Sequence, residues 1–292
     1  MIQLAVESSL IWHRNASLLL EALPQQMTAG YKRFSQHLTK VHSRMSKLPS
    51  KLLKEPLIDV AFEMRFKSDL QASSIVPGLL MAKLGERAKG SAVERMPAAE
   101  MPLQLRASDP NLRYLPLVKI KIDNYSVMVS DYSVVVSCNM PYVGWTPYKA
   151  FIKEIVAVLA NATLIGELER HSLKYVDLIE AASLADQLRA VNFELTIGGY
   201  EVKQEQTQVR VEIPESGHIK VLQVLTGSVM VSEPGRSGTV IDVDVIRPID
   251  LTVPRYLADL DRLLEEIHTI NKQAFFDCLT PQALESLDPV YE

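Results

Sequence analysis

The sequence predicts an α+β fold built from two similar halves behind a basic helical extension. In residues 55–165, and again in 166–292, stretches with the alternating pattern of half-buried strands lead into a stretch with helical spacing. Residues 1–54 hold eight Lys or Arg and two acids, a net charge of +6, whereas the rest holds 23 basic and 33 acidic residues, a net of −10. We therefore expect three regions: 1–54, 55–165 and 166–292.

The composition is that of a globular chain. Of 292 residues, 47% are hydrophobic and 23% charged, which allows a sizeable core. Cys138 and Cys278 lie far apart without a partner motif, which fits a reducing compartment. No apolar run approaches the roughly 18 residues that a membrane span needs, and the opening stretch is a poor signal peptide because its first charge is Glu7. We expect a cytoplasmic protein.

The extension contains a predicted amphipathic helix within residues 31–54. Its apolar residues recur at steps of three and four: Tyr31, Phe34, Leu38, Val41 and Met45. The basic residues that could contact nucleic acid or a membrane are Lys32, Arg33, Lys40, Arg44 and Lys47. Such a helix can also pack on a partner or on its own domain, and we favour the interpretation of residues 1–44 as a leader.

The first half begins with "PLIDVAFEMRF" (56–66), in which polar and apolar residues alternate as in a strand with one buried face. A helix is predicted over about 75–86, and "LPLVKIKIDNYSVMVSDYSVVVSCN" reads as antiparallel strands whose serines face outward. The long helix in "YVGWTPYKAFIKEIVAVLANA" is predicted to begin with Thr146 as N-cap and Pro147 in its first turn.

The second half follows the same order. A strand over 170–181 and a short helix over 182–192 precede the strands at 192–203, 207–214, 217–232 and 239–247. "TIGGYEV" is predicted as a strand with a glycine bulge. A long amphipathic helix starts near Pro254, and Thr280 caps a last short helix.

Each half thus makes a sheet with one apolar face, which its long helix covers. Two such halves can pair edge to edge into one wide sheet. This duplicated arrangement resembles the TATA-binding-protein-like (TBP-like) and helix-grip class of folds, and fold does not fix function.

Four short motifs also resemble a sporadically distributed bacterial family of conserved hypothetical proteins: "EPLIDVAFEMRF", "YVGWTPYKAFI", "HSLKYVDLIE" and "IHTINKQAFFDCLT". The resemblance covers roughly residues 45–290. It departs from the family pattern at Lys174, where the family has Arg, and at Asp177, where it has Asn. The family carries no settled activity; some members lie near mobile-element or defence genes, which implies a context and no chemistry.

The common chemical motifs are absent from the sequence. It contains no HExxH, GxxxxGK[ST], GxGxxG or GxSxG pattern, so we predict no catalytic residues, no cofactor and no metal site. Glu63 and Arg65 share one face of the first strand, where a cross-strand ion pair is expected. The residues that we predict on a partner or ligand surface are Glu63, Arg65, His171, Lys174, Tyr175 and Asp177.

Three functions follow as hypotheses. The first is a binding or regulatory module that engages a protein partner or a small ligand. The second is a nucleic-acid-binding accessory protein that uses the basic helix. The net negative charge of residues 55–292 argues against this second hypothesis. The third is an enzyme with an acid–base pair around Glu63 or His171, which would require these groups to converge in a pocket. We expect no membrane span, and whether the chain forms a homo-oligomer is left open.

Overall fold

A computed structural model describes residues 2–4, 48–88, 91–230 and 235–291. A short strand β1 (Ile2–Leu4) comes first. The strand β2 (Lys51–Leu52) lies at the end of the extension. The first half contains β3 (Leu57–Lys67), α2 (Ala72–Leu84), the 3-10 helix η1 (Gly85–Ala88), β4 (Val93–Arg95), the 3-10 helix η2 (Pro97–Glu100), α3 (Leu103–Ser108), β5 (Val118–Ile122), β6 (Tyr125–Val129), β7 (Ser133–Cys138) and α4 (Trp145–Asn161). The second half contains β8 (Glu167–Glu180), α5 (Leu184–Arg189), β9 (Thr196–Ile197), β10 (Tyr200–Glu201), β11 (Gln208–Glu215), β12 (His218–Met230), β13 (Ser237–Pro248), α6 (Val253–Cys278), α7 (Pro281–Ser286) and β14 (Pro289–Val290).

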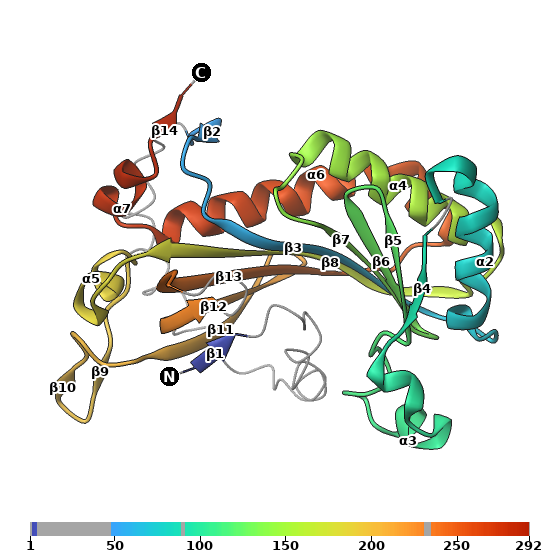
Figure 1. Ribbon diagram of the computed structural model, residues 1–292, viewed down its shortest axis with the longest axis horizontal. Helices are drawn as coiled ribbons and strands as arrows, with labels where there is room; N and C mark the ends of the chain where they lie inside the picture. The colour runs from blue at the N-terminus through green and yellow to red at the C-terminus, as the bar shows by residue number, and fades with distance from the viewer. Residues whose placement is uncertain (1, 5–47, 89–90, 231–234, 292) are drawn as a thin grey trace, which may run out of the picture.

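One wide sheet runs through the molecule (Figure 1). Among the described residues it has ten strands in the order β1-β12-β13-β8-β3-β7-β6-β5-β4, with β11 also paired to β12. Every pair is antiparallel except β1 with β12. The central pair, β3 with β8, joins one half of the chain to the other. The predicted α+β architecture with a large antiparallel sheet is confirmed.

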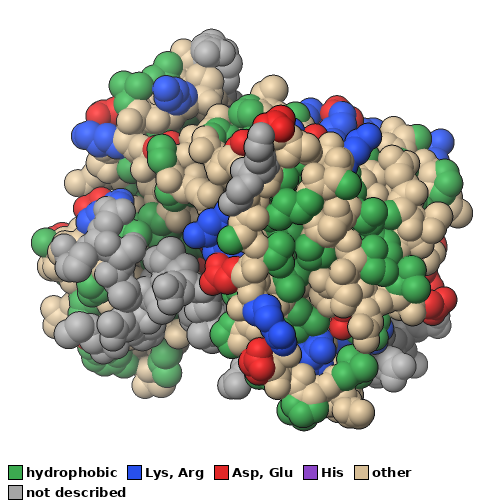
Figure 2. Space-filling model, turned by 45° about the vertical axis from the view of Figure 1, so that its right-hand side comes forward, with side chains coloured by type: hydrophobic (Ala, Val, Ile, Leu, Met, Phe, Trp, Pro, Cys, Tyr) green, Lys and Arg blue, Asp and Glu red, His purple; other side chains and the backbone are tan. Residues whose placement is uncertain are grey.

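Charges of both signs lie interspersed on the surface shown in Figure 2, where Lys and Arg side chains stand beside Asp and Glu rather than in one basic patch. Ion pairs account for part of this mixture. Arg87, for example, donates to the carboxylates of Asp123 and Glu154, each at 2.8 Å. Exposed pairs of this kind stabilise a fold by only about 0–1 kcal/mol each.

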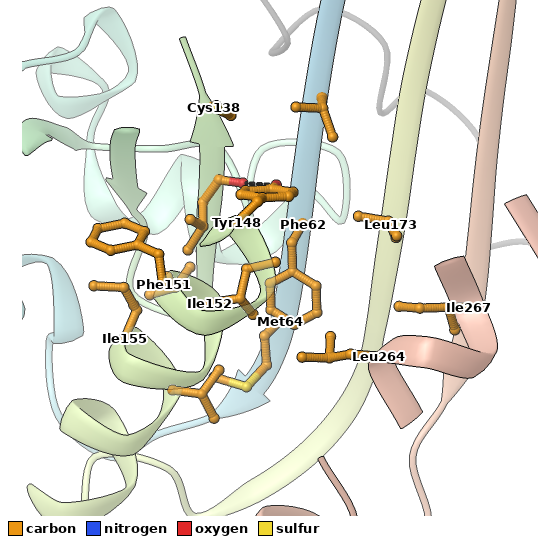
Figure 3. Packing of buried hydrophobic residues seen from close by; sticks show 14 of the residues in the cluster. Phe62, Met64, Cys138, Tyr148, Phe151, Ile152, Ile155, Leu173, Leu264 and Ile267 are labelled. Atoms are coloured by element: carbon orange, nitrogen blue, oxygen red, sulfur yellow. Dashed lines mark hydrogen bonds between the residues drawn. The ribbon is translucent and has the colours of Figure 1, made fainter. Parts of the chain in front are cut away.

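The main core lies between the sheet and the helices α4 and α6, which pack side by side over one face (Figures 1 and 3). Because strand side chains alternate, β3 places Phe62 and Met64 on this helix-covered face, fully buried. α4 and α6 bury their apolar stripes against them. The residues of these two stripes that Figure 3 labels are Tyr148, Phe151, Ile152 and Ile155 of α4 and Leu264 and Ile267 of α6. Burying a side chain of this size stabilises the fold by roughly 1.5–3 kcal/mol.

The serines of the β6–β7 hairpin contradict the expectation that they face solvent. Ser126, Ser130 and Ser133 are at most 2% exposed. The hydroxyls of Ser130 and Ser133 lie 2.9 Å apart, and Ser126 donates to Asn139. Local hydrogen bonds of this kind satisfy buried hydroxyls, which therefore do not need water.

The start of α4 also differs from its prediction. The helix begins at Trp145, and the residue before it is Gly144 with a φ of 92°. Residues other than glycine rarely adopt a backbone conformation with this positive φ, so Gly144 allows the chain to enter the helix here. Thr146 lies inside the first turn, and its prediction as N-cap is wrong.

The "TIGGYEV" stretch is a hairpin and not a bulged strand. Gly198 and Gly199, with φ values of 55° and 82°, form the turn between β9 and β10. A two-residue turn with positive φ at both positions matches the twist of an antiparallel pair. The predicted strand over 192–203 is therefore two short strands.

The described end of the basic extension is not helical. Residues 48–54 run without helix, and β2 within them pairs with β14 near the other end of the chain. Pro49 cannot donate to a helical ladder, which disfavours continuing a helix through this stretch. The remainder of the predicted helix lies outside the described residues, and so do Lys32, Arg33, Lys40, Arg44 and Lys47.

A candidate ligand-binding cleft

A cleft of about 640 Å³ opens beside the helix-covered face of the sheet. The chain segment before β3, the residues that lead into α4 and the second half of α6 form its walls, and Tyr175 and Asp177 of β8 line it from the sheet. Its size is within the range of pockets that hold small molecules, roughly 300–1,000 Å³.

Regular local structure brings these side chains together. On α6, His268, Asn271, Lys272 and Phe275 all line the cleft, and their spacing of three and four residues places them on one face of the helix. On β8, alternation sends Tyr175 and Asp177 to the same face of the sheet. Helical and strand periodicity therefore converge on one hollow.

Aromatic rings form one wall of the cleft. The hydroxyls of Tyr142 and Tyr175 lie 3.1 Å apart, and the Tyr175 hydroxyl lies 3.3 Å from Nδ1 of His268. The Trp145 ring stacks on His268 with centroids 4.1 Å apart and an interplanar angle of 11°. Both oxygens of Glu265 accept from the indole N–H at 3.1 Å, which fixes the indole ring.

The polar groups of this wall are held in their neutral forms. Burial raises the pKa of Tyr142 and of Tyr175, because it disfavours the phenolate. Burial also lowers the pKa of His268 to about 4, against the opposing charge of Glu265. At neutral pH the wall therefore offers neutral hydroxyls and a neutral imidazole.

Asp177 is the chemically unusual group in the cleft. It is 6% exposed, and among the described residues no hydrogen bond or ion pair joins its carboxyl group. Burial raises its pKa well above the usual range, and the negative charges of Glu55 and Asp242 raise it further. Glu55 also lines the cleft, and partial burial raises its pKa too, with Lys51 acting in the opposite direction. The Asp177 carboxyl group lines the cleft rather than the closed core, so a molecule in the cleft can reach it. A little-exposed carboxyl group without a protein partner in such a place is a candidate for ligand contact.

The six residues predicted on a partner or ligand surface do not form one site. Tyr175 and Asp177 line the cleft. His171 lies on the same face of β8 but is fully buried; its Nδ1 lies 2.9 Å from the Tyr256 hydroxyl, and burial lowers its pKa to about 3. Met64 of β3 pairs with His171, whereas Glu63 pairs with Ser172, the next residue of β8. Because side chains alternate along a strand, Glu63 and Lys174 lie on the opposite face of the sheet.

On that opposite face the charges are paired with one another. The Glu63 carboxylate accepts from Arg65 at 2.9 Å and from Arg170 at 2.7 Å. The Arg65 guanidinium lies 4.0 Å from the centroid of the Tyr114 ring. Lys174 binds Asp242 at 2.7 Å. The predicted Glu63–Arg65 pair thus lies along one strand, and Arg170 of the neighbouring strand supplies the cross-strand contact.

Sequence reasoning did not identify Glu55, Tyr142 or Lys272 as site residues. It considered that His268 could point into the space between helix and sheet, but favoured a packing role. No local pattern marks them, since they come from three segments far apart in the chain. The described residues contain no group of three His, Cys, Asp or Glu side chains placed to hold a metal ion. Within the same residues, no helix has the length and apolarity required to cross a bilayer.

Comparison of the chain with protein-family models found no match, and comparison with curated proteins found none.

Proposed function

We propose that this protein is a binding module that takes a small ligand in the cleft beside α6. The observation that carries the proposal is Asp177, a buried carboxyl group that lines the cleft and has no protein partner among the described residues. The volume and the aromatic wall support it, because ligand pockets combine an apolar lining with a few convergent polar groups.

The protonation states of His268 and Tyr175 do not suit a catalytic base or nucleophile. A general base works best with a pKa near the operating pH, whereas burial lowers the pKa of His268 to about 4. Burial raises the pKa of Tyr175, so this side chain remains a neutral phenol, which is a poor nucleophile. The acid–base pair considered from the sequence is not supported either, because Glu63 and His171 lie on opposite faces of the sheet.

We further infer that the two halves are copies of one TBP-like or helix-grip unit. The order strand, helix, three-strand meander and long helix occurs as β3, α2, β5–β7, α4 and as β8, α5, β11–β13, α6. The sheet order is also symmetric about the β3–β8 pair. The defence or mobile-element context implied by the family resemblance belongs to this proposal as its setting.

Nucleic-acid binding through Lys32, Arg33, Lys40, Arg44 and Lys47 is the second candidate, favoured by the net charge of +6 on residues 1–54. Replacing these five residues by Gln would then abolish a binding of DNA or RNA that weakens steeply with salt. A full-length chain that binds neither polymer at low salt would exclude this function.

A fragment screen tests the principal proposal. We expect some small aromatic or amine compounds to raise the melting temperature of the wild-type protein and to lose this effect in Val143→Trp, which fills the cleft. Val211→Trp is the matched control, since Val211 is 44% exposed on β11, away from the cleft. Equal responses of all three proteins would contradict a site in the cleft.

A further inference from the structure

We propose that the ligand of this cleft carries a protonated amine bearing at least one N–H, and that Asp177 is its counter-ion. This inference rests on the proposed function and names the chemical class of the ligand. Its starting point is a carboxyl group that faces the cleft and has no hydrogen-bond or ion-pair partner among the described residues.

Among the described residues, no Lys, Arg or His side chain forms an ion pair with Asp177. The charges that act on its carboxyl group are those of Glu55 and Asp242, and both are negative. Lys272 lines the cleft, and its Nζ lies 6.0 Å from the centroid of the Phe276 ring. The cleft lining holds two acidic side chains, Glu55 and Asp177, and two basic ones, Lys51 and Lys272. A ligand cation placed beside Asp177 would supply the opposite charge that no described side chain supplies to this carboxyl group.

The geometry around Asp177 suits an ammonium group on an apolar body. A carboxylate accepts charge-assisted hydrogen bonds from N–H groups, which are the stronger kind. Tyr142, Tyr175 and Phe275 offer aromatic surface in the same cleft, and aromatic faces attract cations. The ligand would thus place its amine against Asp177 and its hydrocarbon or ring portion along the aromatic wall.

Binding of an amine would also release a proton. The raised pKa of Asp177 favours the protonated carboxyl group in the free protein, and an ammonium ion beside it favours the carboxylate. Affinity for the amine should therefore increase with pH through the range in which free Asp177 titrates.

Calorimetric titration with matched probes tests this inference. The probes are 2-phenylethylamine, the neutral 2-phenylethanol and the anion 3-phenylpropanoate, and hexylamine supplies an amine without a ring. We expect the amines to bind at least about tenfold more tightly than the alcohol, as one charge-assisted hydrogen bond would provide. The heat should change between two buffers of different ionisation enthalpy in proportion to the released proton.

Variants identify the group responsible. Asp177→Asn should lose about tenfold or more in amine affinity and keep its affinity for the alcohol. Asp277→Asn removes an exposed carboxylate from α6 outside the cleft lining and should change neither. Urea unfolding of both variants verifies that they remain folded.

The source of the amine is distinguished by a second titration. The peptide acetyl-Gly-Lys-Gly-amide presents the same chemistry on a lysine side chain. Stronger binding of this peptide than of hexylamine would assign the site to a protein partner, and the reverse would assign it to a free amine; both outcomes support the amine class.

Two results would overturn the inference, and they differ in what else they affect. If alcohol and amine bind equally in the wild type, or if Asp177→Asn binds the amine as well as the wild type does, the amine class is wrong and the cleft remains a binding site. If no probe binds and Val143→Trp alters no response in the fragment screen, the proposed function fails as well.

Discussion

Asp177 and His171 lie on the same face of β8, and burial shifts their pKa values in opposite directions. It raises the pKa of Asp177 and lowers that of His171 to about 3, because the charged form is disfavoured in both. Each shift makes the free energy of unfolding depend on pH. The protein should lose stability in acid through His171 and in base through Asp177.

Replacement of Asp177 tests the basic side. Between the unfolded pKa of an aspartate, about 3.9, and the higher folded pKa, the folded state holds more protons, so stability falls as pH rises. Asp177→Asn removes this slope. We expect the difference in the free energy of unfolding between variant and wild type to grow in favour of the variant by roughly 1 kcal/mol or more from pH 5 to pH 8. Urea unfolding measures this difference. A difference that stays constant with pH would indicate a partner for the carboxylate.

Replacement of His171 tests the acidic side. Below about pH 6.5 the unfolded state takes up a proton that the folded state refuses until about pH 3, so the wild type loses up to about 1.4 kcal/mol per pH unit there. His171→Gln keeps a partner for Tyr256 and removes the titration. Its deficit relative to the wild type should therefore shrink by about 2 kcal/mol between pH 7 and pH 5. Parallel curves would show that His171 has the same pKa in the folded and unfolded states.

At the scale of elements, α6 is attached to the sheet by more than its apolar stripe. Asn271 is 1% exposed, and its Nδ2 donates to the backbone oxygens of Leu173 at 2.9 Å and Val243 at 2.8 Å. One side chain therefore bridges the helix to two neighbouring strands, β8 and β13. It also stands beside the cleft, so it sets the distance between helix and sheet there.

Removal of this bridge should be costly. Asn271→Leu keeps the approximate volume and loses both hydrogen bonds, and we expect a loss of about 1–3 kcal/mol in urea unfolding. Gln273→Leu, on the exposed side of the same helix, should change stability by about 0.5 kcal/mol or less. Similar values for the two variants would mean that the strand oxygens are satisfied in other ways.

The elements also show what the sequence could predict. Long periodic segments were predicted well, since α6 was expected from Pro254 and spans Val253–Cys278. The predicted cap of the last short helix is also found: the Thr280 side chain accepts from the Ala283 N–H at the start of α7. The errors concern local backbone geometry, as at Gly144 and the Gly198–Gly199 turn, where glycine chemistry outweighs the apolar pattern.

The cleft was predictable only in part. Tyr175 and Asp177 were chosen because they share one motif and one strand. Glu55, Tyr142 and His268 come from segments that only the tertiary fold brings together, and no spacing rule connects them.

At the scale of the whole molecule, strand pairing and helix contacts join the halves. β3 pairs with β8 along residues 57–67 and 167–177. α4 and α6 are connected through Glu265, which accepts from Trp145 and, at 2.6 Å, from Lys149. A shared core lies beneath both helices.

We therefore expect the two halves to unfold together. In a Trp12→Phe background, Trp145 is the sole tryptophan and reports on the α4–α6 contact. Its fluorescence and the far-ultraviolet circular dichroism should give one coincident urea midpoint. Two separated midpoints would show that each half folds independently.

The short β2–β14 pair has a consequence for the cleft. Ser50 donates to the Val290 oxygen at 2.8 Å, and Leu53 to that of Asp288 at 3.1 Å, so residues near the carboxy end fasten the segment that walls the cleft before β3. Carboxypeptidase trimming past Asp288 would release that wall. If the cleft holds a ligand as proposed, we expect removal of the residues from Asp288 onward to shorten the time for which the ligand stays bound.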